Sequence, residues 1–295
     1  MSTAVLLSCH GTVEKLEDVP AFLNNIRRGR PTPPELIAEV QHRLAHIGGS
    51  PLMKITNEQA AALEKRLGIR CVAAGRLWHP YPKDVIKNLV EQGITTLISL
   101  PLAPQSVHIY NETVREAAAA HPNLKVVYAP AWGMEPALLE AFIETIDETL
   151  EKVPAEKRTA IPIILSAHSL PLRVIAAGDQ YETQFREMAE AVATHYKEKG
   201  HTTTIAFQSQ GASAEPWLGP DLLETFTQLN KKGATTALIA PIGFLAEHVE
   251  TLYDLDIDAP KLAQKAGLTL LRAKAVCTKP KLIDALETTA RRCMA

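Results

Sequence analysis

Short apolar runs alternate with longer amphipathic stretches along almost the whole chain. Eight of the apolar runs have the length and the Val-, Ile- and Leu-rich composition that are typical of buried strands. They cover residues 4–8, 69–74, 95–100, 125–129, 161–166, 203–207, 236–240 and 268–271. Because strands and helical stretches alternate, the pattern predicts an α/β fold with right-handed crossovers and parallel sheets that are covered on both faces.

The clearest helical stretches are residues 34–46, 57–67, 135–151 and 181–198. Asn57 has the residue type of a helix start, and Gly200 has that of a helix end. Eight parallel strands are also enough to close a barrel, so the strand pattern alone leaves open the choice between one barrel and two open sheets.

An internal repeat favours two open sheets. The segment VLLSCHG at residues 5–11 resembles IILSAHS at 163–169, and in both segments a histidine stands two positions after a serine. Further along the chain, one histidine follows Pro101 and another follows Pro241, each by seven residues. Two matches in the same order indicate a duplicated, four-stranded half.

The repeat predicts two similar doubly wound domains, each with a four-stranded parallel sheet flanked by helices. We expect an N-terminal half at residues 1–155, a C-terminal half at 156–275, and a C-terminal helix within 276–295 that packs back across the halves. Doubly wound sheets bind ligands at the carboxyl ends of their strands. The repeated histidines follow such ends, so we expect them to line a cleft between the halves; they are His10, His108, His168 and His248.

His168 stands directly after a strand, in the segment SAHSLP. A neutral imidazole can bind a metal ion or accept a proton near neutral pH. The alternative is a structural histidine whose ring nitrogens hold its loop in place.

Three acidic residues follow the last of the repeated histidines. If this segment is helical, Glu250, Asp254 and Asp258 lie at i, i+4 and i+8 on one face, where like charges repel unless a cation offsets them. The alternative is a solvated acidic face. Histidine and carboxylates without thiolates suit a divalent cation such as Fe²⁺ better than a structural zinc ion.

Aromatic and basic residues are candidates for binding a flat, acidic ligand. Trp217 and Tyr110 stand beyond strand ends, where rings could stack on an apolar ligand or pack the halves together. Arg27, Arg28 and Arg30 form a dense basic patch, and guanidinium groups bind carboxylates or phosphates in a bidentate manner. A solvated helix end is the alternative interpretation of that patch.

Composition excludes several classes of protein. The chain has 295 residues, of which 46% are hydrophobic and 22% are charged, which is ordinary for a globular protein and excludes collagen-like or disordered chains. With 31 basic and 33 acidic side chains, the net charge of −2 gives no basic surface for a nucleic acid.

The sequence lacks the motifs that are typical of membrane-spanning proteins, of iron–sulfur proteins and of nucleotide-binding enzymes. No stretch approaches the ~20 apolar residues of a membrane-spanning helix, and the N-terminus lacks the features of a signal peptide. The four cysteines form no CxxC pair, so we expect a cytoplasmic protein without a disulfide framework or an iron–sulfur cluster. No GxGxxG segment and no Walker loop is present to hold a nucleotide cofactor.

Several segments, in this order, resemble the signature motifs of the ferrochelatases. They are IGGSPL at residues 47–52, SAHSLP at 166–171, QS at 208–209, WLGP at 217–220, PIGF at 241–244 and HVETLY at 248–253. The resemblance covers nearly the whole chain and implies two doubly wound domains around a porphyrin cleft. It implies an enzyme that inserts Fe²⁺ into a porphyrin with release of two protons, in haem biosynthesis, with iron as substrate and no prosthetic group.

The resemblance also assigns roles to residues. His168 matches the histidine that acts as metal ligand or proton acceptor, Glu250 matches its carboxylate partner, and His248 matches a supporting histidine. Asp254 and Asp258 match an acidic line that brings in the metal. We therefore expect His168 and Glu250 to lie close together. The porphyrin-binding candidates are His10, Arg27, Arg28, Arg30, Ser50, Tyr110 and Trp217.

Two departures from the family pattern concern the substrate and a possible cluster. His10 precedes the first loop glycine, where many short bacterial ferrochelatases have a tyrosine, and Cys293 alone cannot hold the cluster of the longer enzymes. The arginine patch favours coproporphyrin III, which carries four propionates, whereas Trp78 and the two residues after it look more like enzymes that use protoporphyrin IX. The alternatives are a chelatase for another metal or tetrapyrrole and a non-catalytic tetrapyrrole carrier. We expect a monomer.

Overall fold

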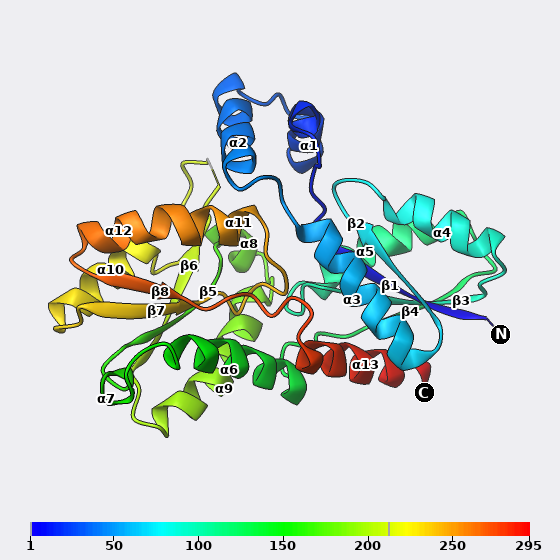
Figure 1. Ribbon diagram of the computed structural model, residues 1–295. Helices are drawn as coiled ribbons and strands as arrows, with labels where there is room; N and C mark the ends of the chain where they lie inside the picture. The colour runs from blue at the N-terminus through cyan, green and yellow to red at the C-terminus, as the bar shows by residue number, and fades with distance from the viewer. Residues whose placement is uncertain (1, 212) are drawn as a thin grey trace. The chain divides into compact units, whose positions relative to one another are not determined.

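The computed structural model describes residues 2–211 and 213–295, which form two compact units. The first unit consists of Met1–Trp132 together with Cys277–Ala295, and the second unit consists of Gly133–Val276. Each unit contains one sheet of four parallel strands with helices packed on it (Figure 1).

The sheet of the first unit has the strand order β2-β1-β3-β4. Its strands are β1 (Thr3–Cys9), β2 (Arg70–Gly75), β3 (Thr96–Pro101) and β4 (Lys125–Tyr128). In the register, Ala4 of the central strand β1 pairs with Arg70 on one side and Leu97 on the other. From Ala4 to Cys9, β1 is buried, which is why its sequence shows a continuous apolar run rather than an alternation.

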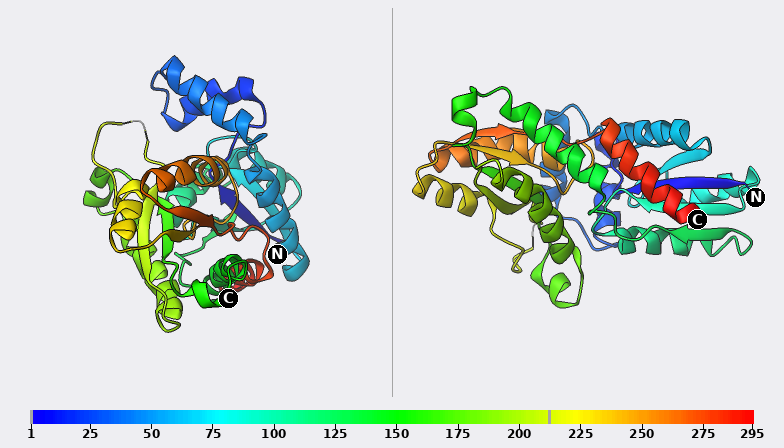
Figure 2. Two further views of the ribbon diagram at one scale, coloured as in Figure 1. Left: turned by 60° about the vertical axis from the view of Figure 1, so that its left-hand side comes forward. Right: turned by 90° about the horizontal axis from the view of Figure 1, so that it is seen from below.

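Helices cover both faces of this sheet (Figure 2). The helices on the sheet are α3 (Leu52–Leu67), α4 (Pro82–Glu91), α5 (Val107–Ala118) and α13 (Pro280–Met294). Helices α1 (Val19–Ile26) and α2 (Pro34–His46) pack on each other and on a short 3-10 turn at Leu16–Asp18. Helices α4 and α5 bury Ile86 and Val114 against Leu6 and Leu97 of the sheet. Helices α3 and α13 pack against each other and on β2 and β3.

The sheet of the second unit has the equivalent order β6-β5-β7-β8. Its strands are β5 (Ile163–His168), β6 (Thr203–Gln208), β7 (Thr236–Ala240) and β8 (Thr269–Arg272). The helices are α6 (Pro136–Leu150), α7 (Ala155–Arg158), α8 (Leu172–Ala176), α9 (Tyr181–Lys197), α10 (Leu222–Lys231), α11 (Val249–Leu252) and α12 (Ala259–Lys265), with a π-helix, η2, at Asp254–Asp258.

Two helical layers pack the second unit. Phe226 of α10 and Leu255 of η2 are fully buried against Ile164 and Ile239 of the sheet. Helix α9 packs on α6, where the buried hydroxyl of Tyr196 donates to the Ile143 carbonyl oxygen at 3.0 Å. The two sheets therefore share one strand order, and the predicted pair of similar α/β halves with four parallel strands each is confirmed.

The compact units do not divide where the sequence placed the domain boundary. They separate between residues 132 and 133 rather than at 155, because α6 packs on α9 within the second unit. Helix α13 belongs to the first unit, where it packs on α3 and β3.

The helix start predicted at Asn57 is wrong. Helix α3 begins at Leu52, directly after Pro51, and buries Leu52, Met53 and Ile55 in its first turn. Those apolar residues extend the amphipathic pattern backwards past Asn57. Within the part of the chain that the structure describes, no helix is both long and apolar enough to cross a membrane.

Candidate active site

His168 and Glu250 form an ion pair at the carboxyl end of the second sheet. His168 is the last residue of β5, whose preceding residues are fully buried, and Glu250 lies in the first turn of α11. The Nδ1 atom of His168 lies 2.9 Å from Oε2 of Glu250, and about one third of each side chain is exposed, at 33% and 31%. The pair is therefore preformed and accessible to a ligand.

Gln208 connects the two elements that carry the pair. It ends β6, directly beside His168 in the register, and its main-chain oxygen accepts a hydrogen bond of 2.7 Å from the Ser169 amide. Its side-chain amide donates to the Glu250 carbonyl oxygen at 2.9 Å and accepts from the Ser166 hydroxyl at 2.8 Å. A buried glutamine with both ends bonded holds the backbone of α11 against the ends of β5 and β6.

A glycine lets the loop after β7 approach β5 closely. A Cβ atom on Gly243 would lie 2.6 Å from the Cβ atom of Ala167, the residue before His168. The Gly243 amide donates to the Ser166 carbonyl oxygen at 3.0 Å. This contact places the segment that leads to α11 directly beside the strand end that carries His168.

His248 is a second imidazole on the same carboxylate. Its Nε2 atom lies 3.8 Å from Oε2 of Glu250, and its ring packs on Phe244 with centroids 4.8 Å apart. Burial, together with the positive charges of His168 and Arg272, outweighs the nearby carboxylates and lowers the pKa of His248.

The pKa of His168 moves in the opposite direction. Burial alone would lower it, but the Glu250 carboxylate, through its charge and its hydrogen bond, and the charge of Asp254 raise the pKa of His168 above its ordinary value. Two imidazoles that share one carboxylate thus have pKa values shifted apart, which is the usual arrangement of groups with different proton-transfer roles. His168 is the stronger base of the two.

The acidic residues after Glu250 have different partners in the structure. Asp254 accepts a hydrogen bond from the Ser209 hydroxyl, whose residue lies next to Gln208 and has a left-handed φ of 58°. Asp258 lies at the other end of η2, where its Oδ1 atom is 3.1 Å from Nζ of Lys261. Among the described residues, no three His, Cys, Asp or Glu side chains gather in a geometry that could hold a metal ion.

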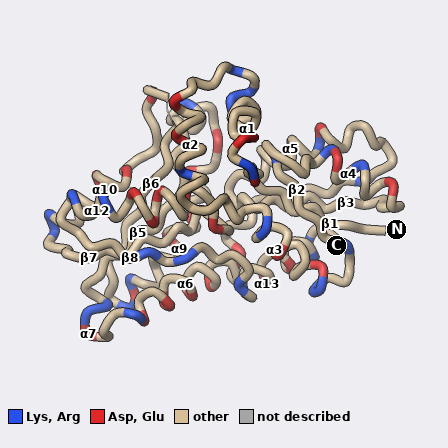
Figure 3. The backbone as a smooth tube through the Cα atoms, turned by 45° about the horizontal axis from the view of Figure 1, so that its top comes forward, with Lys and Arg blue, Asp and Glu red and all other residues tan. Residues whose placement is uncertain are grey.

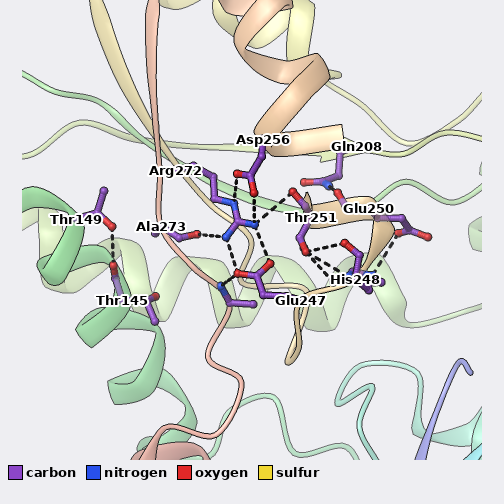
Figure 4. A network of polar contacts seen from close by, with 11 residues as sticks. Thr145, Thr149, Gln208, Glu247, His248, Glu250, Thr251, Asp256, Arg272 and Ala273 are labelled. Atoms are coloured by element: carbon purple, nitrogen blue, oxygen red, sulfur yellow. Dashed lines mark hydrogen bonds and ion pairs between the residues drawn. The ribbon is translucent and has the colours of Figure 1, made fainter. Parts of the chain in front are cut away.

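A largely buried arginine that the sequence patterns did not single out bonds to the segment that carries His248 and Glu250 (Figure 4). Arg272 ends β8 and makes two parallel hydrogen bonds, of 2.6 and 2.7 Å, to the carboxylate of Glu247. Its Nε atom lies 2.8 Å from Oδ1 of Asp256. Burial raises the pKa of Glu247, but the bonds from Arg272 outweigh it, so the pKa of this carboxylate is lowered.

Most of the predicted porphyrin-binding residues lie in the first unit. His10 follows β1 and packs edge-on against Phe22, with centroids 6.0 Å apart. The Tyr110 ring lies under the Arg76 guanidinium at 5.9 Å, and the hydroxyl of Ser50 is buried without a hydrogen-bond partner. Trp217 belongs to the second unit, where it packs on Gly211 and donates to the Ser213 carbonyl oxygen at 3.2 Å.

The three arginines of the basic patch lie at the end of α1 and in the segment that leads to α2, which Figure 3 shows in blue. Arg27 donates to the Pro31 carbonyl oxygen at 3.1 Å and Arg30 donates to that of Arg27 at 3.2 Å. Arg28 and Arg30 are exposed. The patch thus presents guanidinium groups to solvent on a short, locally bonded loop.

Comparisons with known sequences all match this chain to ferrochelatases. The family model described as Ferrochelatase matches residues 2–294. The ferrochelatase of Acidobacterium capsulatum is 37% identical over 96% of this chain and 92% of its own length. The coproporphyrin III ferrochelatase of Geobacillus sp. (strain WCH70) is 35% identical over 96% of this chain and 95% of its own length.

Solved structures show the same fold. SirB from Bacillus subtilis, solved with Fe³⁺, superimposes with a TM-score of 0.62 at 16% identity and covers 100% of this chain and 96% of its own. CbiX, described as the terminal enzyme of sirohaem biosynthesis in denitrifying bacteria, gives a TM-score of 0.58 at 13% identity, with 99% of both chains covered. At these identities the likeness supports the two-sheet architecture alone.

Proposed function

This chain belongs to the ferrochelatase family and is an enzyme that inserts iron into a porphyrin for haem synthesis, and from that premise we propose that His168 and Glu250 form its catalytic pair. Insertion breaks two pyrrole N–H bonds and forms the bonds between the porphyrin nitrogens and Fe²⁺, so two protons leave for each iron ion that enters. A base beside the porphyrin is therefore required. The observation that carries the proposal is the 2.9 Å contact between His168 and Glu250.

The geometry assigns a role to each ring nitrogen of His168. Nδ1 faces Glu250, so in the neutral ring it carries the proton and donates to the carboxylate, which leaves the Nε2 lone pair as proton acceptor or iron ligand. When Nε2 takes a pyrrole proton, the Glu250 carboxylate stabilises the imidazolium that forms. The raised pKa of His168 reflects this stabilisation, and it makes the ring a better acceptor than an isolated histidine.

His248 and the acidic residues complete the proposal. With its pKa lowered, His248 stays neutral near pH 7 and orients Glu250 without adding a positive charge that would repel Fe²⁺. Asp254 and Asp258 would lead the incoming ion towards the pair. We expect Asp254 to matter more, because it is bonded beside Gln208 and contributes to the pKa of His168, whereas Asp258 is paired with Lys261.

Coproporphyrin III is the substrate that we propose. It carries four propionates where protoporphyrin IX carries two, so it gains more from guanidinium groups, and Arg27, Arg28 and Arg30 cluster at one exposed loop. Ser50 and Tyr110 are further donors in the same unit. Relatives of Geobacillus sp. and Bacillus pumilus at 35% and 34% identity are named coproporphyrin III ferrochelatases, which supports the choice. His10 and Trp217 would contact the macrocycle.

The test is the steady-state kcat/KM for both porphyrins with Fe²⁺ under anaerobic conditions, for the parent and for Arg28→Ala and Arg30→Ala. We expect a preference for coproporphyrin III and, in the double variant, a KM for it that rises about tenfold or more, since each lost charge-assisted bond contributes about 1.5–3 kcal/mol when well formed. Arg115→Ala is the matched control, because Arg115 is an exposed arginine of the same unit, paired with Glu112. A preference for protoporphyrin IX, or an unchanged KM in the arginine variants, would reject the assignment.

The remaining expectations concern the state of the protein: a cytoplasmic monomer without a prosthetic group or an iron–sulfur cluster. Cys9 and Cys71 are free thiols and are buried. Burial raises the pKa of the Cys71 thiol to about 12, which disfavours the thiolate that binds iron. Sedimentation velocity tests the oligomeric state, and a mass corresponding to a dimer at micromolar concentration would contradict it.

A further inference from the structure

Arg272 is largely buried at the end of β8, an edge strand of the second sheet, with 10% of its side chain exposed. Besides the two bonds to Glu247, its Nη2 atom donates to the Thr251 carbonyl oxygen at 3.3 Å and to Oδ2 of Asp256 at 3.2 Å. Figure 4 shows the guanidinium group between these partners. One side chain thus contacts the segment of residues 247–256 at three points.

Along the sequence, the three residues that Arg272 contacts stand next to or near the candidate active-site residues His248, Glu250 and Asp254. Glu247 directly precedes His248, Thr251 directly follows Glu250, and Asp256 lies two residues after Asp254. Residues before and after Glu250 therefore bond to the same guanidinium group.

The backbone of this segment departs from regular α-helical hydrogen bonding. Helix α11 has four residues and continues through Tyr253 into the five-residue π-helix η2 and then into α12, and a π-helical turn within a helix is frequent at functional sites. The Glu250 carboxylate nevertheless has to lie within hydrogen-bond distance of His168, which belongs to a different strand. Contacts from outside the segment add to its own bonds: Gln208 donates to the Glu250 carbonyl oxygen, and Arg272 bonds to residues on both sides of Glu250.

We propose that Arg272 is a positioning residue for iron insertion, which holds residues 247–256 so that His248 and Glu250 face His168. This inference rests on the proposed role of the His168–Glu250 pair. Glu247, the main partner of Arg272, also accepts a hydrogen bond of 2.9 Å from the Ala275 amide. The contacts of Arg272 with Glu247, Thr251 and Asp256, here called the three-point clamp, are therefore also bonded to the chain after β8. A lysine could not replace the arginine, because a single ammonium group cannot make two parallel bonds to Glu247 and reach Asp256 on another edge.

The first experiment compares Arg272→Lys and Arg272→Gln with the parent in anaerobic iron-insertion kinetics. We expect kcat to fall about tenfold or more in the lysine variant and further in the glutamine variant, since misplacement of a reacting group by ~1 Å can cost ~10²-fold. The KM for the porphyrin should stay within twofold of the parent value. Arg186→Gln is the control, because Arg186 is an exposed arginine of the same unit, paired with Glu182. An unchanged kcat in both Arg272 variants would overturn the proposal.

A double-mutant cycle separates positioning from a purely structural role. If Arg272 acts through Glu250, then Arg272→Lys should reduce kcat by less than twofold in a Glu250→Gln background. If it reduces kcat by the same factor in both backgrounds, Arg272 merely supports the fold and the positioning role is wrong. If Glu250→Gln alone keeps the parent kcat, the proposed pair itself fails, and the positioning role fails with it.

A milder variant keeps the proposal testable if loss of the guanidinium group prevents folding. Asp256→Asn leaves the Arg272–Glu247 pair intact and removes the charge of a carboxylate that is 42% exposed, so the fold should survive. We expect kcat to fall about two- to tenfold, with the same non-additivity towards Glu250→Gln. If Arg272→Lys does not fold and Asp256→Asn has the kcat of the parent, the contact with Asp256 does not position Glu250. The three-point clamp is then rejected.

Discussion

Replacement of Glu250 by glutamine tests the catalytic pair with the smallest change of shape. The variant removes one negative charge from a position 2.9 Å from Nδ1 of His168 and 3.8 Å from Nε2 of His248. A hydrogen bond to a charged group contributes about 1.5–3 kcal/mol. At 1.36 kcal/mol for each factor of ten, the loss of that bond in the transition state corresponds to roughly 10- to 150-fold in rate.

The loss of proton acceptance adds to this factor. A glutamine amide can turn its NH₂ group towards Nδ1, which forces the proton of His168 onto Nε2 and removes the lone pair that would take the pyrrole proton. General acid–base catalysis contributes ~10²–10⁴-fold, so we expect kcat of Glu250→Gln to fall by about that range. The assay is the anaerobic formation of iron porphyrin, followed by its visible absorption.

The same variant makes a prediction about stability and pH. In the parent, Glu250 raises the folded-state pKa of His168 above its ordinary value of 6.5. The pair therefore stabilises the folded state fully below about pH 6.5, and this contribution is lost as the pH rises through the raised pKa. The Tm difference between the parent and Glu250→Gln should be largest in mildly acidic buffer and should shrink above the folded-state pKa.

The control for both measurements is Glu182→Gln, because Glu182 pairs with Arg186 on the surface of α9 in the same unit. We expect parent-like kcat and little pH-dependent change in Tm. The reasoning is refuted if Glu250→Gln retains kcat within threefold of the parent, or if its Tm deficit is the same at acidic and alkaline pH.

Three further predictions concern a close backbone contact at Gly243, the hydroxyl of Tyr196 and the cysteines. Gly243→Ala should lower the free energy of unfolding by about 1–3 kcal/mol in a denaturant titration, because the new Cβ would lie 2.6 Å from that of Ala167; parent-like stability would contradict this close approach. Tyr196→Phe should lower the free energy of unfolding by about 1.5–3 kcal/mol, since it removes the hydroxyl that bonds to the Asp147 carboxylate and the Ile143 carbonyl oxygen, and a gain in stability would contradict it. Anaerobically purified protein should contain no acid-labile sulfide, and a stoichiometric amount would show that the cysteines hold a cluster.

Much of the fold could be predicted because buried parallel strands leave a strong local signal. The central strands β1, β3, β5 and β7 are covered on both faces, so they appear in the sequence as continuous apolar runs, and the duplicated order of such runs indicated the two halves. Features that depend on packing between elements could not be predicted from the sequence in the same way. The start of α3 at Leu52 and the packing of α6 on α9 depend on which apolar faces meet, and a local period does not specify that.

The candidate site shows the same division. His168 and Glu250 follow strand ends in recognisable motifs, so their proximity could be expected from the sequence. Arg272 and Gln208 could not be assigned their contacts, because each bonds to a segment that is far away along the chain. Glu250, Asp254 and Asp258 were spaced for a regular α-helix, but the backbone changes to a π-helix at Asp254, and Asp258 pairs with Lys261. The position of Arg272, directly after the apolar run at residues 268–271, is only weak evidence for an ion pair inside the protein.

The measurement that tests the central claim most directly is a multiple-turnover insertion assay with His168→Ala beside the parent. Both proteins are mixed anaerobically with coproporphyrin III and excess Fe²⁺, after circular dichroism and porphyrin titration have shown that both are folded and bind the porphyrin. We expect the parent to form many equivalents of iron coproporphyrin and the variant to form it ~10²–10⁴-fold more slowly. Equal rates in the two proteins, or a parent that binds the porphyrin without metallating it, would contradict the claim that His168 receives the protons that iron displaces.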